Sequence, residues 1–588
     1  MAWYDEAIFY HIYPLGLAGA PKENHYDGVE HRLKGLMPWI GHIREIGCNA
    51  LYIGPLFESV GHGYETTDYK KLDCRLGDNA DLKEFVAKCH KMGILVILDG
   101  VFNHTGRDFF AFKDIQQNRE GSRYKDWYCN VNFWGNNEYN DGFSYDNWGG
   151  YNLLAKLNQR NPEVRNYITE VIRFWVKEFD IDGLRLDAAD VLDFDFMKEL
   201  RRVAGEVKQD FWLMGEVIHG DYTRWVNEGT LHSVTNYVMH KALYSGHNDH
   251  NYFEIAHTQR RLEGMGGAGS GGFKLYNFVD NHDVERIYTK LNNKAHFTPV
   301  HILLYTLPGI PSIYYGSEFA IEGRKEKYSD ASLRPALNLE DYKNALQDNP
   351  ATKLIASLAR IRASQKALSY GDYRELLLTN RQYAFSRNHE GSCVAVSVNN
   401  DDSDYVMTLP VSGSGKYVGA LWGEEVQVQN GSITVNVKAN SGEIWVPAEG
   451  AGKVKRQEPV VVKEAGAQPA APVSEAVSTG EPPVSEAVSA GEPPVSEGES
   501  LAAAPVSKPE AEAAAPAKPE AEAAAPASKT PGSGSGEGGS FEDGIIAGLQ
   551  EAVIALMEKN GPVTDQMRKD VKDNVYHDSL INWIKSFR

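Results

Sequence analysis

Carboxylates and histidines stand at the ends of four apolar runs, where they could act as acids, bases and nucleophiles. One motif of this kind could be an ordinary strand end or a helix cap. Four of them on successive strands of one barrel would instead converge on a central pocket, so we expect a single active site. The motifs are DGVFNH (99–104), GLRLD (183–187), GEV (215–217) and FVDNHD (278–283).

Asp187 and Glu216 have the features of a nucleophile and a proton donor. Arg185 and Asp187 are two positions apart, so on a strand their side chains point the same way and the guanidinium favours the ionised carboxylate. Glu216 follows the apolar run WLMG, and desolvation there would raise its pKa and keep it protonated until it donates. Such a pair cleaves glycosides through a covalent intermediate when the carboxyl groups lie roughly 5 to 5.5 Å apart, and we expect this spacing.

Three more side chains complete the expected site. Asp283 would be a third carboxylate, able to hold sugar hydroxyls as the ring becomes oxocarbenium-like. His104 and His282 would then donate hydrogen bonds to hydroxyls of the same ring. An isolated buried histidine is more often a core side chain, so the binding role depends on the convergence of the motifs.

The elements that must position these residues follow one rhythm before about residue 350. Apolar runs such as ILVILDG and PSIYYGSE alternate with amphipathic helical segments. The runs are apolar on both faces, as buried parallel strands are. The pattern predicts an α/β fold, a TIM (β/α)8 barrel over residues 1–365. An aromatic, glycine-rich stretch at 103–158 is too long for a barrel loop and predicts an inserted subdomain, and helix signals resume at Asn161-Pro162.

Three further segments follow the barrel. Alternating runs within 366–450 predict a C-terminal antiparallel β domain. Residues 451–540 repeat PVSEAVS and KPEAEAAAPA, a composition typical of a disordered linker. Residues 541–588 regain helical periodicity and predict a small α-helical module, which either docks on its own barrel or binds a partner or a second copy.

Composition narrows the partners and the location. A formal charge of −20 repels phosphate backbones and anionic lipids, so we expect neither nucleic acid nor a membrane as a partner. The five cysteines are an odd, scattered set that we interpret as reduced. With no signal-peptide pattern and no apolar run of 18 residues, a cytoplasmic protein is expected. The 11 Trp and 30 Tyr include candidates for covering the apolar faces of sugars.

The four motifs resemble the conserved regions of the α-amylase superfamily, glycoside hydrolase family 13, in order and spacing. The resemblance covers about residues 1–447 and implies a TIM barrel with an inserted domain B and a β-sandwich domain C. It implies a retaining mechanism with Asp187 as nucleophile, Glu216 as acid/base and Asp283 as transition-state stabiliser. The residues expected to bind substrate are His62, Tyr64, His104, Arg185, His282, Asp330 and Arg334.

Within that family the chain resembles the cyclomaltodextrinase and neopullulanase branch, although it lacks the extra N-terminal β domain usual there. The similar segments are residues 108–128, LAKLN at 154–158 and the spacing from Asp330 to Arg334. Typical α-amylases place Lys and His three and four positions after the nucleophile, where this chain has Asp190 and Val191, so a preference for long starch is not implied.

We therefore expect hydrolysis of internal α-1,4 bonds in maltooligosaccharides, cyclodextrins or starch, with an α-glucan as substrate. Transglycosylation through the same intermediate is an alternative, and a glucan-binding protein without catalysis is a second. No cofactor is required for the chemistry. For a structural calcium ion, Asn103 matches a family ligand, with Asp141 and Asp146 as further candidates that are more often turn residues.

Overall fold

The computed structural model describes residues 2–266, 273–327, 329–413 and 415–448. All of them belong to one unit, Met1–Pro494. The expected linker (451–540) and helical module (541–588) lie outside the described residues. Within the described part of the chain, every helix is too short or too polar to cross a lipid bilayer.

Eight parallel strands form the barrel that the sequence predicts. Strand β1 pairs with both β2 and β13, and a bridge between Thr235 and Tyr276 closes the ring between β11 and β12. The barrel is therefore complete. Its strands are β1 (Phe9–Ile12), β2 (Ala50–Ile53), β5 (Leu95–Gly100), β9 (Gly183–Leu186), β10 (Trp212–Gly215), β11 (Ser233–Val234), β12 (Tyr276–Asn277) and β13 (Ile310–Tyr314).

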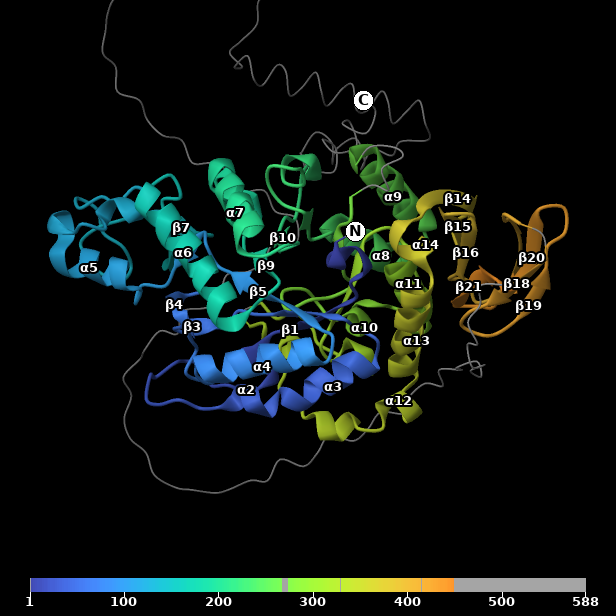
Figure 1. The fold of residues 1–588 in the computed structure, drawn as a ribbon, viewed down its shortest axis with the longest axis horizontal. Helices are drawn as coiled ribbons and strands as arrows, with labels where there is room; N and C mark the ends of the chain where they lie inside the picture. Colours follow the sequence, from blue (N-terminus) through green and yellow to red (C-terminus); the bar gives the residue numbers. More distant parts are fainter. Residues whose placement is uncertain (1, 267–272, 328, 414, 449–588) are drawn as a thin grey trace, which may run out of the picture. The chain divides into compact units, whose positions relative to one another are not determined.

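Helices surround the strands, as α3, α4, α6, α11 and α13 show in Figure 1. Their apolar faces pack on the outside of the barrel, which leaves polar strand ends for the site. The longer ones are α3 (Met37–Glu45), α4 (Asn79–Lys91), α6 (Pro162–Phe179), α7 (Phe194–Val207), α8 (Tyr237–Asn248), α9 (Tyr252–Gly266), α11 (Phe297–Thr306) and α13 (Pro350–Ser364). The shorter ones are α1 (Pro14–Leu17), α2 (Arg32–Gly35), α10 (Ile287–Lys290), α12 (Ala345–Asp348) and α14 (Lys366–Tyr370).

Helix α6 begins where the sequence predicts. The Asn161 side chain accepts a hydrogen bond from the Glu163 backbone N–H at 2.8 Å, and Pro162 occupies the first turn. Its buried Trp175 stacks on Phe57 with ring centroids 4.3 Å apart. The cap and this ring contact hold α6 directly before β9, the strand that leads to Asp187.

Two excursions from the barrel lie beside the strand ends. The first is a hairpin of β3 (Phe57–Ser59) and β4 (Thr66–Leu72), which the sequence analysis did not predict and whose connection carries His62 and Tyr64. The second is the inserted segment. It contains α5 (Phe110–Asn118) and a sheet in the order β6 (His104–Thr105), β8 (Tyr151–Lys156), β7 (Asn147–Trp148).

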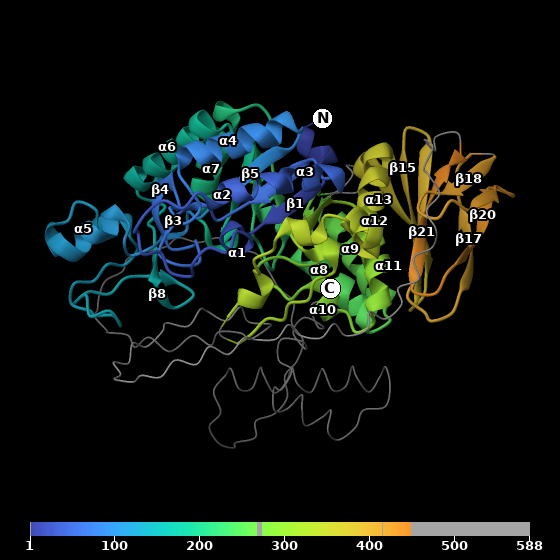
Figure 2. The same cartoon turned by 90° about the horizontal axis from the view of Figure 1, so that it is seen from below.

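After the barrel the chain forms an antiparallel β sandwich, as expected. Six strands form one sheet and two form the other, and Met407 and Val435 of the smaller sheet pack with Trp445 of the larger. Figure 2 shows β21 beside α11, which it contacts. The sheets run β14 (Asp372–Leu378), β15 (Gln382–His389), β16 (Ser392–Asn399), β21 (Ser441–Pro447), β18 (Lys416–Gly419), β19 (Glu425–Gln427), and β17 (Tyr405–Pro410) with β20 (Ser432–Val437).

Candidate active site

One buried guanidinium joins three carboxyl groups at the ends of β5, β9 and β10. Arg185 Nη1 donates to Asp99 Oδ1 at 2.9 Å and to Asp187 Oδ1 at 2.8 Å. Its Nη2 lies 2.8 Å from Glu216 Oε2. The expected nucleophile and the expected proton donor therefore contact the same side chain.

The backbone after β9 also holds Glu216. Ala188 has a φ of +46°, an uncommon conformation for a residue with a β-carbon. Its N–H donates to Glu216 Oε2 at 3.1 Å, while the Tyr237 hydroxyl donates to Oε1 at 3.5 Å. The turn that follows Asp187 thus fixes the position of the second carboxyl group.

The charges in this group are unbalanced. Burial raises the pKa of both Asp187 and Glu216 above the usual carboxyl range, and the charge of Arg185 opposes this effect. Burial raises the pKa of Asp99 as well. One guanidinium offsets one negative charge, so the three carboxyl groups compete for it while burial favours their protonated forms. A cluster with both ionised and protonated carboxyl groups can supply a nucleophile and an acid.

Asp283 lies in a different environment, among cationic and hydrogen-bonding groups. Its Oδ2 is 3.0 Å from His282 Nε2, and its Oδ1 is 3.0 Å from Arg334 Nη2. Burial by itself would raise the pKa of Asp283, but His282, Arg334 and nearby cations outweigh this effect and lower the pKa to about 2. Asp283 is therefore ionised at neutral pH, and its pKa is shifted in the opposite direction from those of the carboxyl groups around Arg185.

Tyr64 links the two clusters. Its hydroxyl donates to Asp99 Oδ2 at 3.3 Å and hydrogen-bonds to His282 Nε2 at 2.5 Å. Its ring lies nearly parallel to that of His282, with centroids 5.8 Å apart, and 5.9 Å from the Arg185 guanidinium carbon. Three expected substrate residues, Tyr64, Arg185 and His282, thus meet around the carboxylates.

The other residues expected to bind substrate do not contact the carboxyl groups around Arg185 directly. Asp330 Oδ2 is 3.2 Å from Arg334 Nη2, so it helps to orient that side chain toward Asp283. His62 Nε2 pairs with Glu65 at 3.1 Å. His104 is buried with its pKa lowered to about 3, so it is neutral, and its Nε2 has no partner among the described residues.

Several functional side chains were not assigned a role from sequence. Asp99 ends its strand in the motif DGVFNH, a signal that could have identified it as an Arg185 partner. Tyr52, on the adjacent strand, donates to Asp99 Oδ2 at 2.8 Å. Lys325 Nζ donates to the Asp283 carbonyl at 2.9 Å and pairs with Asp330 at 3.0 Å, and no motif indicated it.

The residues considered for calcium do not assemble a site. Asn103 Oδ1 is a buried oxygen without a hydrogen-bond partner among the described residues, which suits a calcium ligand. Asp141, however, is paired with Arg107 at 2.6 Å, and Asp146 accepts a hydrogen bond from Asn130 at 2.8 Å. Their carboxylates are used within the inserted segment.

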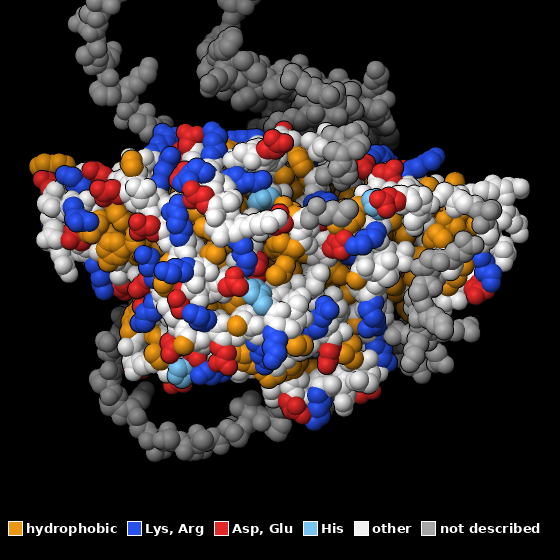
Figure 3. Space-filling model, in the orientation of Figure 1, with side chains coloured by type: hydrophobic (Ala, Val, Ile, Leu, Met, Phe, Trp, Pro, Cys, Tyr) orange, Lys and Arg blue, Asp and Glu red, His pale blue; other side chains and the backbone are white. Residues whose placement is uncertain are grey.

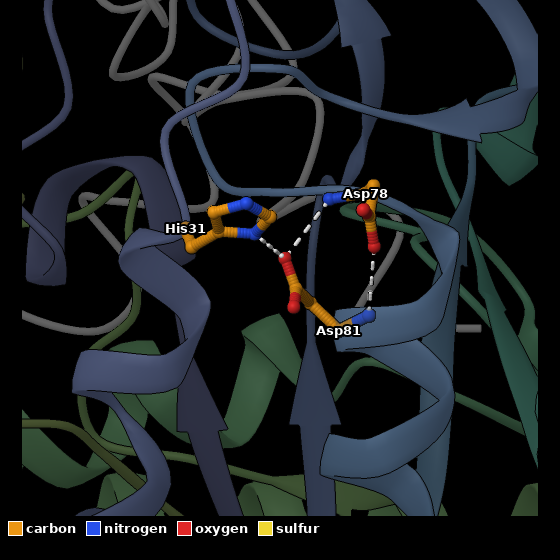
Figure 4. Close-up of side chains that lie close together, drawn as sticks. All are labelled: His31, Asp78 and Asp81. Carbon is orange, nitrogen blue, oxygen red and sulfur yellow. Dashed lines mark hydrogen bonds and ion pairs between the residues drawn. The ribbon is translucent and has the colours of Figure 1, made fainter.

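One trio of potential metal-ligating side chains occurs elsewhere in the described residues, namely His31, Asp78 and Asp81. Figure 4 shows that their hydrogen-bonding groups are used among themselves: the Asp81 carboxylate accepts from His31, and each aspartate carboxylate accepts from the backbone N–H of the other aspartate, which forms the capping box of α4. Lys34 also pairs with Asp81 at 3.0 Å. The trio is accounted for as a helix cap.

Asp283 predicts a specific pH dependence of stability. Its folded pKa of about 2 lies below the ordinary value of 3.8, so its ionised form stabilises the fold above about pH 4 and this stabilisation is lost as the pH falls toward 2. From pH 5 to pH 3, the free energy of unfolding in urea should fall by about 1 kcal/mol less in Asp283→Asn than in the wild type.

The exposed Asp195, paired with Lys198 at 2.8 Å, provides the matched control. Asp195→Asn should follow the wild type over the same pH range. An identical fall for Asp283→Asn and the wild type would contradict the proposed electrostatic setting of Asp283.

Known proteins resemble this chain in sequence and in fold. Residues 22–353 match the model of the α-amylase catalytic domain. A cyclomaltodextrinase of Thermoanaerobacter pseudethanolicus is 32% identical over 430 residues, covering 69% of this chain and 72% of that protein. Neopullulanase 2 of Thermoactinomyces vulgaris is 31% identical over 474 residues, covering 75% and 78%. A solved cyclomaltodextrinase gives a TM-score of 0.67 at 26% identity, covering 76% of this chain and 78% of that one.

These matches confirm the resemblance inferred from the four motifs, and they agree with the barrel and the C-terminal antiparallel sheet domain. The carboxyl groups around Arg185 lie at the strand ends where a barrel enzyme carries its chemistry. The chain therefore belongs to the α-amylase family, glycoside hydrolase family 13, and is an amylase-type O-glycosyl hydrolase.

Proposed function

We propose that this hydrolase cleaves α-1,4-glucosidic bonds in maltooligosaccharides, cyclodextrins or starch, with retention of the anomeric configuration. The observation that carries the proposal is the contact of Asp187 and Glu216 with one guanidinium, each at 2.8 Å. The names of the relatives, cyclomaltodextrinase and neopullulanase, support an α-glucan substrate.

In the proposed first step, ionised Asp187 attacks the anomeric carbon while Glu216 gives its proton to the departing glycosidic oxygen. The carbon–oxygen bond breaks and a glycosyl ester forms on Asp187. In the second step, Glu216, now a carboxylate, takes a proton from water as the water oxygen attacks the same carbon. The ester bond breaks, and two inversions yield a product of the original configuration.

Substrate contacts are proposed for the groups between the two clusters. Asp283, ionised and held by Arg334, would bind hydroxyls whose hydrogen bonds strengthen in the transition state. Tyr64 would offer its ring to the apolar face of the reacting glucose, and neutral His104 and His282 would donate to hydroxyls. Asp330 is a positioning residue because it acts through Arg334, and His62 is proposed for the rim of the site.

The nucleophile is tested by a product time course on maltoheptaose, β-cyclodextrin, soluble starch and pullulan. We expect the wild type to cleave at least one of them and to release the α-anomer first, as followed by ¹H NMR. Asp187→Asn should lower kcat by about 10³-fold or more, because the amide cannot form the ester. Asp195→Asn on the surface of α7 should leave kcat unchanged.

Three results would contradict this proposal. Release of the β-anomer would indicate inversion, and equal activity of Asp187→Asn would remove the nucleophile. Absence of cleavage of all four substrates by the wild type would reject the substrate class. Products longer than the substrate would instead favour transglycosylation, in which a sugar hydroxyl replaces water in the second step.

The acid/base role is tested with leaving groups of different basicity. Glu216→Ala should lose activity on maltoheptaose by about 10²-fold or more, because no group protonates the glycosidic oxygen. With α-maltosyl fluoride, whose leaving group needs no proton, the loss in the bond-breaking step should be much smaller. Equal losses on the two substrates in single-turnover measurements would contradict the assignment of Glu216.

A structural calcium ion is not part of this proposal, because Asp141 is paired with Arg107 and, of the three candidate residues, Asn103 alone has a buried oxygen without a hydrogen-bond partner among the described residues. A cytoplasmic location is proposed on the five free cysteines, and fractionation of the source cells tests it. Nucleic acid is not proposed as a partner. Figure 3 shows Lys and Arg side chains interspersed with Asp and Glu on the visible face, which gives no basic surface for phosphates.

Self-association through residues 541–588 is proposed on sequence alone, because Ile545, Leu549, Val553 and Leu556 recur at helical spacing. Deletion of 541–588 should lower the mass measured by light scattering and leave kcat/KM on maltoheptaose within about twofold. The same number of subunits per particle in the full chain and in the truncated chain would contradict self-association.

A further inference from the structure

A tryptophan in the inserted segment is almost fully exposed. Trp134 is 94% exposed, and no aromatic ring or hydrogen-bond acceptor contacts its indole among the described residues. Every other exposed aromatic residue in the described part of the chain is less than half exposed, for example Phe253 at 47%. A single exposed apolar side chain is not unusual by itself, but a whole exposed indole offers a flat ring on which a ligand can stack.

The backbone that carries this indole forms a well-connected turn. The Trp134 N–H donates to Asn132 Oδ1 at 3.0 Å, which forms a tight turn. Asn132 and Ser144 exchange two backbone hydrogen bonds of 2.8 and 2.9 Å, and Gly135 packs so closely on Ser144 that a β-carbon would clash with it. These bonds fix the backbone from which the indole projects into solvent.

Two adjoining hollows lie at this part of the inserted segment, and Trp134 lines the first of them. The first, of about 630 Å³, is lined by Glu120, residues 130–134 and residues 144–146. The second, of about 620 Å³, shares Asn130, Val131, Phe133 and Asp146 with the first and reaches Val191 and Asp193. These last two residues lie four and six positions after Asp187. We call the two hollows together the outer groove.

The lining of the outer groove suits a neutral polar ligand. Two lysines and Arg160 line it together with three aspartates and Glu120, and Arg160 is paired with Asp193 at 3.1 Å. Nearly balanced charge gives little attraction for an anion or a cation. Asn130, Asn132 and Ser144 supply amide and hydroxyl groups, and Phe133 and Trp134 supply ring surface.

We propose that the outer groove binds an α-glucan chain, with Trp134 as the stacking platform at its outer end. A glucan combines apolar ring faces with neutral hydroxyls, as the lining requires, and the groove leads to the loop behind Asp187. The inference rests on the proposed function, since it extends the same substrate beyond the residues that cleave it. A single exposed ring amid polar groups fits a sugar better than the contiguous apolar patch of a protein interface.

The binding test uses gel electrophoresis in soluble starch with Asp187→Asn, which binds without digesting the polymer, and saturating maltotriose to occupy the catalytic site. Adding Trp134→Ala should raise the apparent Kd for starch about threefold or more, and Trp134→Phe should fall between the two. Phe253→Ala, an exposed aromatic on α9 outside the groove, is the control and should have no effect.

The kinetic test compares substrate lengths in the active enzyme. Trp134→Ala should reduce kcat/KM on soluble starch at least threefold more than on maltotriose, through KM and not through kcat. Equal losses on both substrates would overturn the proposal, because Trp134 would then act on the catalytic site. An unchanged Kd for starch in Trp134→Ala would also overturn the proposal. If that variant also showed a lower oligomer mass, the occupant of the outer groove would be a second copy of the chain.

The outcomes separate this inference from the proposed function. If the wild type cleaves α-glucans and Trp134→Ala matches it in every assay, only the outer groove fails. If the wild type cleaves none of the substrates but Trp134→Ala weakens retention in starch, the groove stands and the catalytic proposal fails.

Discussion

The site depends on a buried arginine that must be neutralised. An unpaired guanidinium in a barrel interior would be strongly destabilising, so Arg185 requires acceptors on the strands beside it. The register supplies them: Asp99 on β5 lies directly opposite Arg185 on β9, and Arg185 lies opposite Met214 on β10, two residues before Glu216. Pairing of the strands and assembly of the carboxyl cluster are therefore one event.

The surplus of carboxyl groups around that arginine separates the roles of the acidic residues. Asp283, surrounded by Arg334, Lys325 and His282, has a lowered pKa and stays ionised. The Asp187 and Glu216 carboxyl groups share one cation and have raised pKa values. Around Asp187 and Glu216, the charge of Arg185 favours an ionised carboxyl group and burial favours a protonated one, and acid-assisted displacement requires one of each.

The excursions from the barrel add recognition to this chemistry. The β3–β4 connection brings Tyr64 between Asp99 and His282, and the segment after β5 places His104 at the start of the inserted subdomain. The outer groove is lined mostly by that same subdomain and reaches Val191 and Asp193, in the segment that follows β9. Loops of unrelated length can thus extend a binding surface while the strands keep the reacting groups in place.

The sequence by itself determined the barrel elements and indicated the carboxyl groups proposed to react. Apolar runs ending in carboxylates predicted the barrel strands and Asp187, Glu216 and Asp283, and Asn161-Pro162 predicted the start of α6, because these signals are local. Periodicity did not reveal the β3–β4 hairpin, because its strands are short and partly polar and their sequence pattern is like that of a loop.

Only the tertiary structure decided which charges meet. Asp99 pairs with Arg185 across 86 positions, and Lys325 approaches Asp283 from beyond β13. Arg107 takes the Asp141 carboxylate that was considered for calcium. Such pairings depend on strand order, register and the path of long loops, and the energy of a charge depends on its burial, so neither could be derived from the spacing of residues along the chain.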